Sequence, residues 1–532
     1  MVEKIANKPL DARKGGISVQ EPHASGVTDK FLEFDALQDK VTALKAEGKK
    51  VVLCHGVFDL MHIGHIRHFE QAKKKGDVLV VTLTPDQYVN KGPHRPAFSQ
   101  TLRAEAIAAL NCVDYVAINK WPMAIELIKH IKPDYYVKGS DYKDSEKDVT
   151  GGIALEREAI ESVGGELFFT DDIVFSSSAL INRHLPVFSK ELSDYLEGFS
   201  RKYSADDVIG YFDKMRPLKV LVVGEAIIDE YNYCQAIGKS SKEPMLAIKQ
   251  LSSEKFAGGI LAVANNVSSF SDNVGLVTIL GEQESEEEFI RRNLNDKVDT
   301  KFLFRPDSPT IVKKRFIESY FFTKLLEVYS INDAALNDAD DKRLCQILDE
   351  TIENYDAVIV VDFGHSMVTP EAASILCKKA KFLAVNTQSN AGNLGYQTIY
   401  KYSRADYICV TENEVRLEVR DKANDLKNII PKLATDLDCD RVVITRGKVG
   451  CMCYEKQSGF YELPAVAGTV VDRMGAGDAF LSITSMCAAL GAPMDVLGFI
   501  GNAVGAQAVA TVGHRSSIVR PTLTKFITSL LK

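Results

Sequence analysis

Two kinds of hydrophobic pattern alternate along the first third of the chain. Residues 31–47 place apolar side chains at helical spacing, and residues 49–60 then form an expected buried strand followed by a turn. Further strands are expected at 77–85, 113–119, 134–139 and 166–172, and helices at 62–76, 101–111, 124–133 and 154–165. Strands that alternate with helices of this length predict an α/β domain with a doubly wound parallel sheet.

The alternation stops and then starts again at Leu218, where a new buried strand opens. Between the two, residues 187–216 are charged and helical in pattern, without strand signals, which predicts a connector. Two later stretches, 244–253 and 313–330, alternate like β-strands, and the second is rich in aromatic residues, so we expect a small projecting sheet. From residue 355 strand–helix alternation returns, which predicts a second α/β domain that differs from the first.

The chain is expected to contain two domains, because 532 residues exceed what one hydrophobic core supports. We predict a mobile polar N-terminal lead at 1–28 and a first α/β domain at 29–186. A helical connector is expected at 187–216 and the second α/β domain at 217–532. Both domains are predicted to be built on doubly wound parallel sheets.

Composition narrows the class of protein. The formal net charge of −8 argues against a surface that coats nucleic acid. No signal-peptide pattern is seen, and no apolar run reaches the roughly 20 residues that cross a bilayer. Ten cysteines without a ligand or disulfide pattern fit a reducing cytoplasm. We therefore expect a cytoplasmic protein that binds small molecules, and neither nucleic acid nor membrane.

His62, Gly64 and His65 lie at an expected helix start, directly after the strand and turn at 49–60. The carboxyl end of a parallel strand is where ligands bind, and a helix amino terminus offers free N–H groups to phosphate. Because the histidines are three residues apart, both rings can lie on one face, and Gly64 lets a ligand approach the backbone. This favours stabilisation of charge on a triphosphate. A pair of helix-cap histidines without a ligand is the alternative.

The segment GVFDLMHIGH, residues 56–65, resembles the cytidylyltransferase-type nucleotidyltransferases along its whole length. VKGSDY (137–142) and FSSSALI (175–181) resemble further segments of that family, in the expected order. The resemblance implies that His62, His65 and Lys91 are catalytic. It implies nucleotide or phosphate ligands at Gly56, Phe58, Asp59, Gly64, Arg95, Arg103, Lys138, Gly139, Asp141, Ser176, Ser177 and Ser178.

The implied reaction is attack by a substrate phosphate on the α-phosphorus of ATP or CTP, with release of pyrophosphate. Positioning and charge stabilisation carry such a reaction, normally with Mg²⁺ as the cofactor. For Arg95 and Arg103, a solvated surface position is the alternative to a phosphate contact.

VVDRMGAGDAF, residues 470–480, carries the strongest signal of the second half. Gly475, Ala476 and Gly477 can present backbone N–H groups to an anion at a helix start, and Asp478 can accept a proton from a substrate hydroxyl. Phosphoryl transfer needs both parts, a base at the nucleophile and a cradle for the γ-phosphate. The alternative is an ordinary turn in which Asp478 only caps the helix.

The second half resembles the ribokinase/PfkB-type sugar kinases over nearly its full length. The resemblance implies a sugar site that includes Asp229, Gly258, Gly259 and Asn266, with Asp229 holding a hydroxyl. It implies nucleotide contacts at Thr445, Gly447, Gly450, Gly475, Ala476 and Gly477, and a magnesium-associated motif at Asn413 and Glu414. The β-type stretches correspond to the lid of that family, which commonly forms a homodimer interface. As bare sequence they fit an ordinary sheet edge as well.

Together the halves resemble the bifunctional heptose-phosphate kinase/nucleotidyltransferases, with the domain order swapped so that the transferase comes first. The chain departs from that pattern at Ala262, where Asn is typical, at His365 and Ser366, where a Lys is usual, and at Arg416, where an acidic residue would complete N-x-x-E. The changes at Ala262 and at 365–366 bear on the sugar and nucleotide pockets, and Arg416 bears on metal binding.

We predict a bifunctional sugar-activating enzyme. The kinase would phosphorylate a sugar or sugar phosphate with ATP, and the transferase would attach AMP or CMP to a sugar phosphate. One alternative is that only one half is active and the other is a binding or regulatory module. Another is a scaffold or nucleic-acid-associated protein, which the acidic balance disfavours.

Overall fold

The structure is a computed structural model that describes residues 29–89, 95–139, 152–170, 188–393, 395–468 and 470–532. Two compact units divide the chain, one built mainly from residues before 178 and the other mainly from residues after it. Each unit has its own sheet and hydrophobic core. Across the described ranges, every helix is too short or too polar to span a bilayer. The lead predicted at 1–28 lies outside the described residues.

The first unit is built on a parallel sheet of five strands in the order β3-β2-β1-β4-β5. The strands are β1 (Val51–Gly56), β2 (Val78–Leu83), β3 (Tyr115–Ile118), β4 (Tyr135–Gly139) and β5 (Glu166–Thr170). The helices are α1 (Phe34–Ala46), α2 (Ile63–Lys73), α3 (Gln100–Ala108), α4 (Ala124–Ile131) and α5 (Gly152–Ser162). Helices α1, α4 and α5 pack on one face, and α2 and α3 pack on the other. This confirms the predicted doubly wound sheet.

The strand order of this sheet reverses between β1 and β4, which pair directly, with Cys54 opposite Val137. Residues 51–54 of β1 are buried on both faces, which explains the continuous apolar run in the sequence. In a parallel sheet, ligands bind outside the carboxyl ends of strands at such a reversal. The turn after β1 and the end of β4 therefore share one edge of the sheet.

The second unit contains a sheet of nine strands in the order β10-β9-β6-β13-β14-β15-β16-β17-β18. The strands from β10 to β16 in this order are parallel, and β17 and β18 add an antiparallel edge. Their bounds are β6 (Lys219–Gly224), β9 (Asn273–Gln283), β10 (Val298–Pro309), β13 (Ala357–Asp362), β14 (Leu383–Thr387), β15 (Tyr407–Thr411), β16 (Arg441–Thr445), β17 (Cys451–Glu455) and β18 (Gly459–Leu463).

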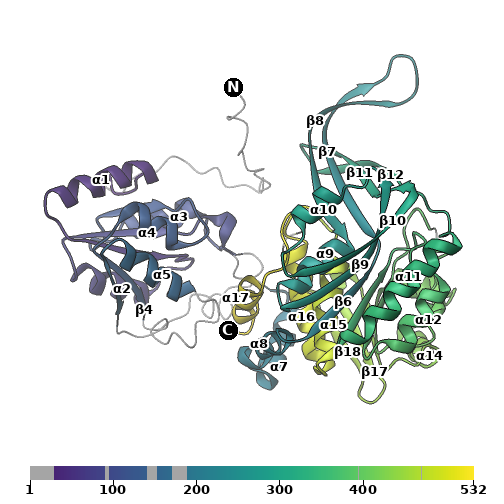
Figure 1. The fold of residues 1–532 in the computed structure, drawn as a ribbon. Coiled ribbons are helices and arrows are strands. Elements are labelled where there is room, and N and C mark those ends of the chain that lie inside the picture. The colour runs from purple at the N-terminus through teal and green to yellow at the C-terminus, as the bar shows by residue number, and fades with distance from the viewer. Residues whose placement is uncertain (1–28, 90–94, 140–151, 171–187, 394, 469) are drawn as a thin grey trace. The chain divides into compact units, whose positions relative to one another are not determined.

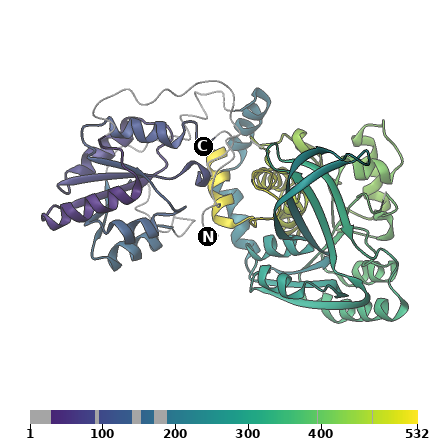
Figure 2. The ribbon, with the colours of Figure 1, turned by 90° about the horizontal axis from the view of Figure 1, so that it is seen from above.

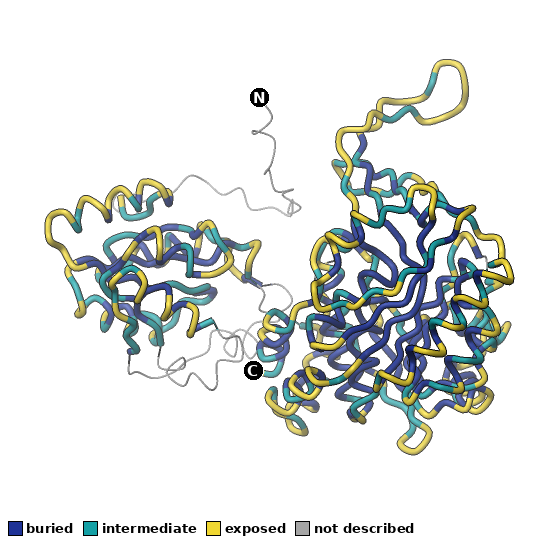
Figure 3. The backbone as a smooth tube through the Cα atoms, viewed as in Figure 1, coloured by how far each residue is buried: buried dark blue, intermediate teal, exposed yellow. Residues whose placement is uncertain are grey.

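Helices cover both faces of this sheet, as the view from above in Figure 2 also shows. One face carries α7 (Lys190–Lys202), α8 (Ala205–Met215), α9 (Ile260–Ser268), α15 (Ala476–Ala489), α16 (Met494–Ala508) and α17 (Arg520–Leu530). The other carries α11 (Asp338–Thr351), α12 (Pro370–Lys379) and α14 (Leu426–Asp436). Shorter helices are α10 (Glu287–Asn293) and α13 (Glu412–Glu418). The strands between the helix layers form the buried centre in Figure 3.

The helices α7 and α8, predicted as a connector, are part of the core of the second unit. Leu192, Leu196 and Phe199 of α7 are buried in it. The ring of Phe199 stacks on Phe499 of α16, with centroids 4.4 Å apart. The apolar side of each helix is buried like that of any core helix, whereas a linker between domains would leave it exposed.

A separate sheet of four strands, in the order β12-β11-β7-β8, confirms the predicted small sheet. It is formed by β7 (Ala226–Lys239), β8 (Leu246–Gly259), β11 (Ile311–Glu318) and β12 (Thr323–Ser330), and its β7–β8 hairpin projects in Figure 1. The sequence pattern did not show that the apolar run from Leu218 divides between two sheets. A Cβ on Gly224, where β6 ends, would lie 2.2 Å from the carbonyl oxygen of Val361, so this position accepts only glycine.

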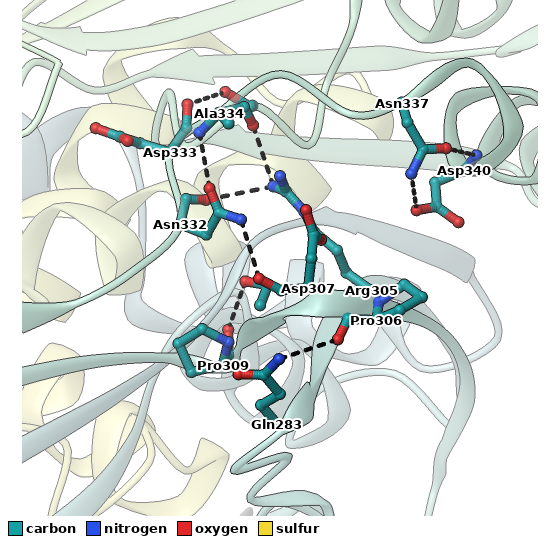
Figure 4. Close-up of polar contacts among 12 residues, drawn as sticks. Gln283, Arg305, Pro306, Asp307, Pro309, Asn332, Asp333, Ala334, Asn337 and Asp340 are labelled. Carbon is teal, nitrogen blue, oxygen red and sulfur yellow. Dashed lines mark hydrogen bonds and ion pairs between the residues drawn. The ribbon is translucent and has the colours of Figure 1, made fainter.

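Arg305 of β10 holds the segment that follows β12. Its buried guanidinium donates to the carbonyl oxygens of Asn332 and Ala334, at 3.3 and 3.1 Å, and to Asp307 at 3.0 Å (Figure 4). Ser366 donates to the carbonyl oxygen of Asp333, at 3.0 Å. These bonds tie the end of the small sheet to the turn after β13.

Candidate functional site

The turn after β1 brings His62 and His65 together. His62 caps α2, His65 lies in its first turn, and the two rings stack with centroids 3.8 Å apart. Phe58 adopts a positive φ of 49° and packs edge-on against His65 at 5.2 Å. A Cβ on Gly56 would lie 2.9 Å from the Phe58 ring, so this ring packs into the space that Gly56 leaves. Burial lowers the pKa of His62, which favours a neutral imidazole.

Asp59 and Arg103 hold this turn in place. The buried carboxylate of Asp59 accepts from the N–H groups of Ala97 and Phe98, at 2.7 and 3.3 Å. Arg103 is 2 % exposed and donates to the carbonyl oxygens of Val57, Thr84 (3.0 Å) and Phe98 (3.1 Å) and to Asp86 (2.6 Å). These bonds hold the guanidinium inside the unit, so we infer that Arg103 acts as a structural clamp. Its predicted phosphate contact stays a prediction.

Lys138 and Gly139 end β4, at the sheet edge where β1 also ends. Lys138 forms a 2.9 Å ion pair with Glu156 of α5. Sequence reasoning missed two histidines in this region, His55 and His68. Burial, together with the charge of Lys138, lowers the pKa of His55 to about 3 and that of His68 to about 4, so both are neutral at physiological pH.

Of the remaining residues predicted for the first unit, two are described by the structure and the others are not. Arg95 is buried. Gly64 lies in the first turn of α2. The predicted ligands Lys91, Asp141, Ser176, Ser177 and Ser178 lie outside the described residues.

In the second unit, Asp478 lies in the first turn of α15, three residues after the cap Gly475. Its buried carboxylate accepts a 2.6 Å hydrogen bond from Gln388, which follows β14. Burial raises the pKa of Asp478 above its usual value, and the neighbouring charge of Asp229 acts in the same direction. A Cβ on Gly477 would meet no atom within 4 Å, so the backbone beside Asp478 is open. The predicted base and anion cradle are therefore adjacent.

Asp229 of β7 lies between two cationic side chains. Arg315 of β11 donates to Oδ1 of Asp229 and, at 2.7 Å, to Glu327. The Nε2 atom of His514 lies 3.4 Å from Oδ2. Burial opposes ionisation of Asp229, but His514 and Arg315 outweigh it and lower the pKa to about 2, so Asp229 is a carboxylate. Neither Arg315 nor His514 was found from the sequence, because no local motif marks them.

The di-glycine pair has a direct steric explanation. A Cβ on Gly258 would lie 2.1 Å from Oδ2 of Asp229, and Gly259 caps α9 with a φ of 55°. Only glycine fits at Gly258 beside this carboxylate, and Gly259 has the left-handed backbone that glycine tolerates best.

A cavity of about 270 Å³ lies against this site. It is lined by residues of β8, α9, the start of α15 and the loop after α16, among them Ala262, Asn266, Gly475 and His514. Asn266, predicted to bind the sugar, accepts a 2.9 Å hydrogen bond from the backbone N–H of Ile518. Asn266 therefore holds the loop that carries His514.

Lys313 and Asp472 are further charged residues that sequence reasoning missed. Lys313 is buried on β11, with its Nζ 5.0 Å from the ring centre of Tyr329, and burial lowers its pKa. Asp472 precedes the Gly475 turn and accepts from Tyr231 at 2.7 Å, from Lys324 at 2.6 Å and from the N–H of Gly513 at 3.0 Å. The small sheet, the Gly475 turn and the His514 loop thus meet at Asp472.

The turn after β13 contains the departures His365 and Ser366. Glu225, just after β6, accepts from the N–H groups of Phe363 and His365, both at 3.0 Å. Burial, and next the charge of Asp362, raises the pKa of Glu225 to about 7. Burial also lowers the pKa of His365 to about 4, so His365 carries no charge where the resemblance leads one to expect Lys.

The predicted magnesium motif is a helix cap in the structure. Glu414 and Thr411 form a reciprocal capping box at α13, and Glu414 also accepts from the N–H of Ser389 at 3.1 Å. Asn413 is exposed, and Arg416 pairs with Glu412 at 2.9 Å. Among the described residues, no cluster of three or more His, Cys, Asp or Glu side chains could hold a metal ion.

The predicted nucleotide strand–turn is present after β16. Thr445 ends the strand, and Gly447 and Gly450 have φ values of 57° and 108°. A Cβ on Gly450 would lie 2.0 Å from the carbonyl oxygen of Leu463, so the turn requires glycine there.

Comparison with known proteins finds two family matches. Residues 53–183 match the cytidylyltransferase-like family, and residues 217–521 match the pfkB family carbohydrate kinases. The bifunctional protein HldE of Syntrophotalea carbinolica is 35 % identical over 164 residues, 29 % of this chain and 32 % of that protein. HldE of Geobacter metallireducens is 40 % identical over 140 residues, 26 % and 27 % of the two chains. Each alignment thus spans about a third or less of the relative.

Among solved structures, phosphofructokinase-2 from Escherichia coli in complex with potassium aligns with 59 % of this chain and 100 % of its own, at 15 % identity and a TM-score of 0.48. The pfkB match covers more than half of the chain and contains Asp229, Gly258 and Asp478. The protein, which also carries a cytidylyltransferase-like segment, belongs to the pfkB family of carbohydrate kinases.

Proposed function

We propose that the second unit transfers the γ-phosphoryl group of ATP to a hydroxyl of a sugar or sugar phosphate. The placement of Asp478 carries this proposal, because its buried carboxylate lies in the first turn of α15, beside the N–H groups of that helix start. The hydroxyl gives its proton to Asp478 while its oxygen bonds to the γ-phosphorus. The bond to the bridging oxygen breaks, and its electron pair leaves with ADP.

Two features support a sugar as the acceptor. The carboxylate of Asp229 is ionised, so it can accept hydrogen bonds from hydroxyl groups. The absence of a side chain at Gly258 provides the space in which this carboxylate lies. A cavity of about 270 Å³ next to these residues offers space for part of a substrate.

For the first unit we propose transfer of AMP or CMP from a nucleoside triphosphate to a sugar phosphate. The substrate phosphate attacks the α-phosphorus, and pyrophosphate leaves with the electron pair of the broken bond. The stacked His62 and His65 at the start of α2 support this, because they lie where helix N–H groups and the sheet edge meet. Lys138 adds a positive charge at the end of the neighbouring strand.

Mg²⁺ is the cofactor we propose for both reactions. Both oxygens of Glu414 already accept hydrogen bonds from backbone N–H groups, so Glu414 is a poor candidate for a magnesium ligand. Mg²⁺ commonly binds through substrate phosphates and keeps several waters. We therefore assign the ion to the triphosphate and give it no protein ligand.

We further propose that the protein is a homodimer that pairs through the small sheet. Four large apolar side chains of the β7–β8 hairpin are more than half exposed: Ile237, Met245, Leu246 and Leu251. Leu251→Glu should shift sedimentation toward the monomer. Leu155→Glu, which changes an exposed leucine of α5, is the matched control. Identical sedimentation of both variants and the wild type would contradict this interface.

A second candidate is that the kinase half binds nucleotide without turnover. Arg416 supports it, because the position that would complete N-x-x-E carries a cation paired with Glu412. ATP binding without phosphorylation of any acceptor would favour this candidate over the kinase.

The deciding experiment incubates the full chain with ATP or CTP and a panel of sugars and sugar phosphates, with mass and pyrophosphate detection. We expect phosphorylated and nucleotidylated products. Asp478→Asn should abolish phosphorylation and leave pyrophosphate release intact, and His65→Ala should do the reverse. If Asp478→Asn behaves like the wild type, the kinase assignment is wrong.

A further inference from the structure

His514 lies between the two parts of the proposed kinase site. Its Nε2 atom is 3.4 Å from Oδ2 of Asp229 on β7. On its other side, Cε1 would be only 2.1 Å from a Cβ on Gly475, the cap of α15. The imidazole therefore occupies the space that the missing side chain of Gly475 leaves. It thus contacts both the carboxylate proposed to hold the sugar and the helix start proposed to hold the γ-phosphate.

The ring is also within reach of a ligand. The side chain of His514 is 12 % exposed and lines the cavity of about 270 Å³. Ala262, another lining residue, has no polar group to offer, and the amide oxygen of Asn266 is engaged by the backbone of Ile518. His514 thus brings an ionisable group to this wall of the cavity.

Charged groups from several elements face His514. Asp229 of β7, Asp478 of α15 and Arg315 of β11 act on it, and Glu254 and Lys255 of β8 and Arg515 line the same cavity. Burial opposes the charged form, but the carboxylates of Asp229 and Asp478 outweigh burial and Arg315, so the pKa of His514 is raised. A raised pKa extends the imidazolium form toward neutral pH.

We propose that His514, as an imidazolium, is a catalytic residue of the kinase that stabilises the phosphoryl group in transit between nucleotide and acceptor. The inference rests on the proposed kinase function. As the hydroxyl proton moves to Asp478 and the γ-phosphorus passes to the acceptor oxygen, negative charge spreads over the phosphoryl oxygens. A cation beside the cap of α15 favours that charge distribution more than the ground state. The ion pair with Asp229, 3.4 Å between Nε2 and Oδ2, orients the ring.

The competing explanation is structural, since His514 also joins its loop to Asp229 and packs on Gly475. The two explanations differ in what they predict for pH. A structural anchor affects substrate affinity and stability, whereas an imidazolium at the transferring group makes kcat fall when it loses its proton.

The test uses the full chain, ATP and an acceptor that the wild type phosphorylates. His514→Gln keeps a hydrogen-bonding group of similar length without the charge. We expect kcat to fall about 100-fold at neutral pH, as on removal of one transition-state donor, with a change of only a few-fold in the acceptor KM. The wild-type kcat should decline at alkaline pH, and this decline should be absent in His514→Gln. His130→Gln, which changes an exposed histidine of α4, should leave kcat and its pH profile unaltered.

An unchanged alkaline decline in His514→Gln, or a rise in KM alone, would overturn the proposal while the kinase function stands. If the wild type phosphorylates no acceptor, both the proposal for His514 and the kinase function are refuted. Because His514→Gln can fail to fold, histidine NMR of the wild type gives an independent measure. The imidazole resonance assigned to His514 should titrate above the ordinary value for histidine, and a neutral ring at pH 7 refutes the proposal.

Discussion

The phenol of Tyr231 donates a 2.7 Å hydrogen bond to the carboxylate of Asp472, although 241 positions separate the two residues. Tyr231 belongs to the small sheet and Asp472 to the turn that leads into α15. Lys324 and the N–H of Gly513 share the same carboxylate. The bond therefore couples the small sheet to the Gly475 turn, where phosphoryl transfer is proposed.

Loss of this bond should weaken the second unit. Tyr231→Phe should lower the free energy of unfolding by about 1–3 kcal/mol, because a buried carboxylate loses one partner. Denaturant unfolding measures the change. Tyr320→Phe, at a tyrosine in the turn between β11 and β12 that is 71 % exposed, should change stability by less than about 0.5 kcal/mol. Equal stability of the two variants would show that the bond contributes nothing.

Gly258→Ala should abolish sugar phosphorylation, because the added Cβ would lie 2.1 Å from Oδ2 of Asp229 and displace that carboxylate. Pyrophosphate release by the first unit should persist, which separates a local effect from misfolding. Gly198→Ala in α7 is the matched control, since its Cβ would meet nothing within 4 Å. Normal kinase activity in Gly258→Ala would mean that the carboxylate is not part of the site.

Arg103→Ala should destabilise the first unit by about 3 kcal/mol or more, since it leaves several buried carbonyl groups and Asp86 without a donor. Thermal unfolding provides the measurement. Arg157→Ala, at an exposed arginine of α5, is expected to have little effect. A variant of Arg103 with normal stability but weakened triphosphate binding would instead restore the phosphate contact that the sequence suggested.

The free energy of unfolding should depend on pH through the titration of Glu225. Its pKa is raised from 4.5 to about 7, so the folded state keeps a proton that the unfolded state has already released between these values. The stabilising contribution is fully present below pH 4.5 and is lost as pH rises through about 7. Glu225→Gln should flatten this decline in denaturant titrations. An identical pH profile for variant and wild type would contradict the assignment.

Kinase turnover should decline in acid at a higher pH than an ordinary aspartate would give. The raised pKa of Asp478 means that its carboxylate, the form able to accept a proton, is lost at a higher pH than for an ordinary aspartate. The acid limb of kcat against pH measures this. A rate that stays constant down to pH 3.8, the ordinary pKa of aspartate, would exclude Asp478 as the base.

Local sequence determined much of the architecture. The alternating periods predicted both doubly wound sheets, and the β-type stretches predicted the small sheet. The helix starts at His62 and Gly475 were also recognisable, because hydrophobic spacing, glycines and capping residues act over only a few positions. These features place His62 beside His65 and Asp478 beside Gly477 without any knowledge of distant contacts.

The tertiary structure alone decided which distant side chains complete each site. Arg315 reaches Asp229 because β7 and β11 pair in parallel, with Lys313 opposite Asp229, and His514 arrives on the loop after α16. The sequence predicted Arg103 as a phosphate ligand, and only the folded unit shows the carbonyl groups that accept its hydrogen bonds. Hydrophobic periodicity indicates which face of a helix or strand is buried. Packing partners, pKa shifts and steric limits at glycines arise only when remote strands and loops pack together.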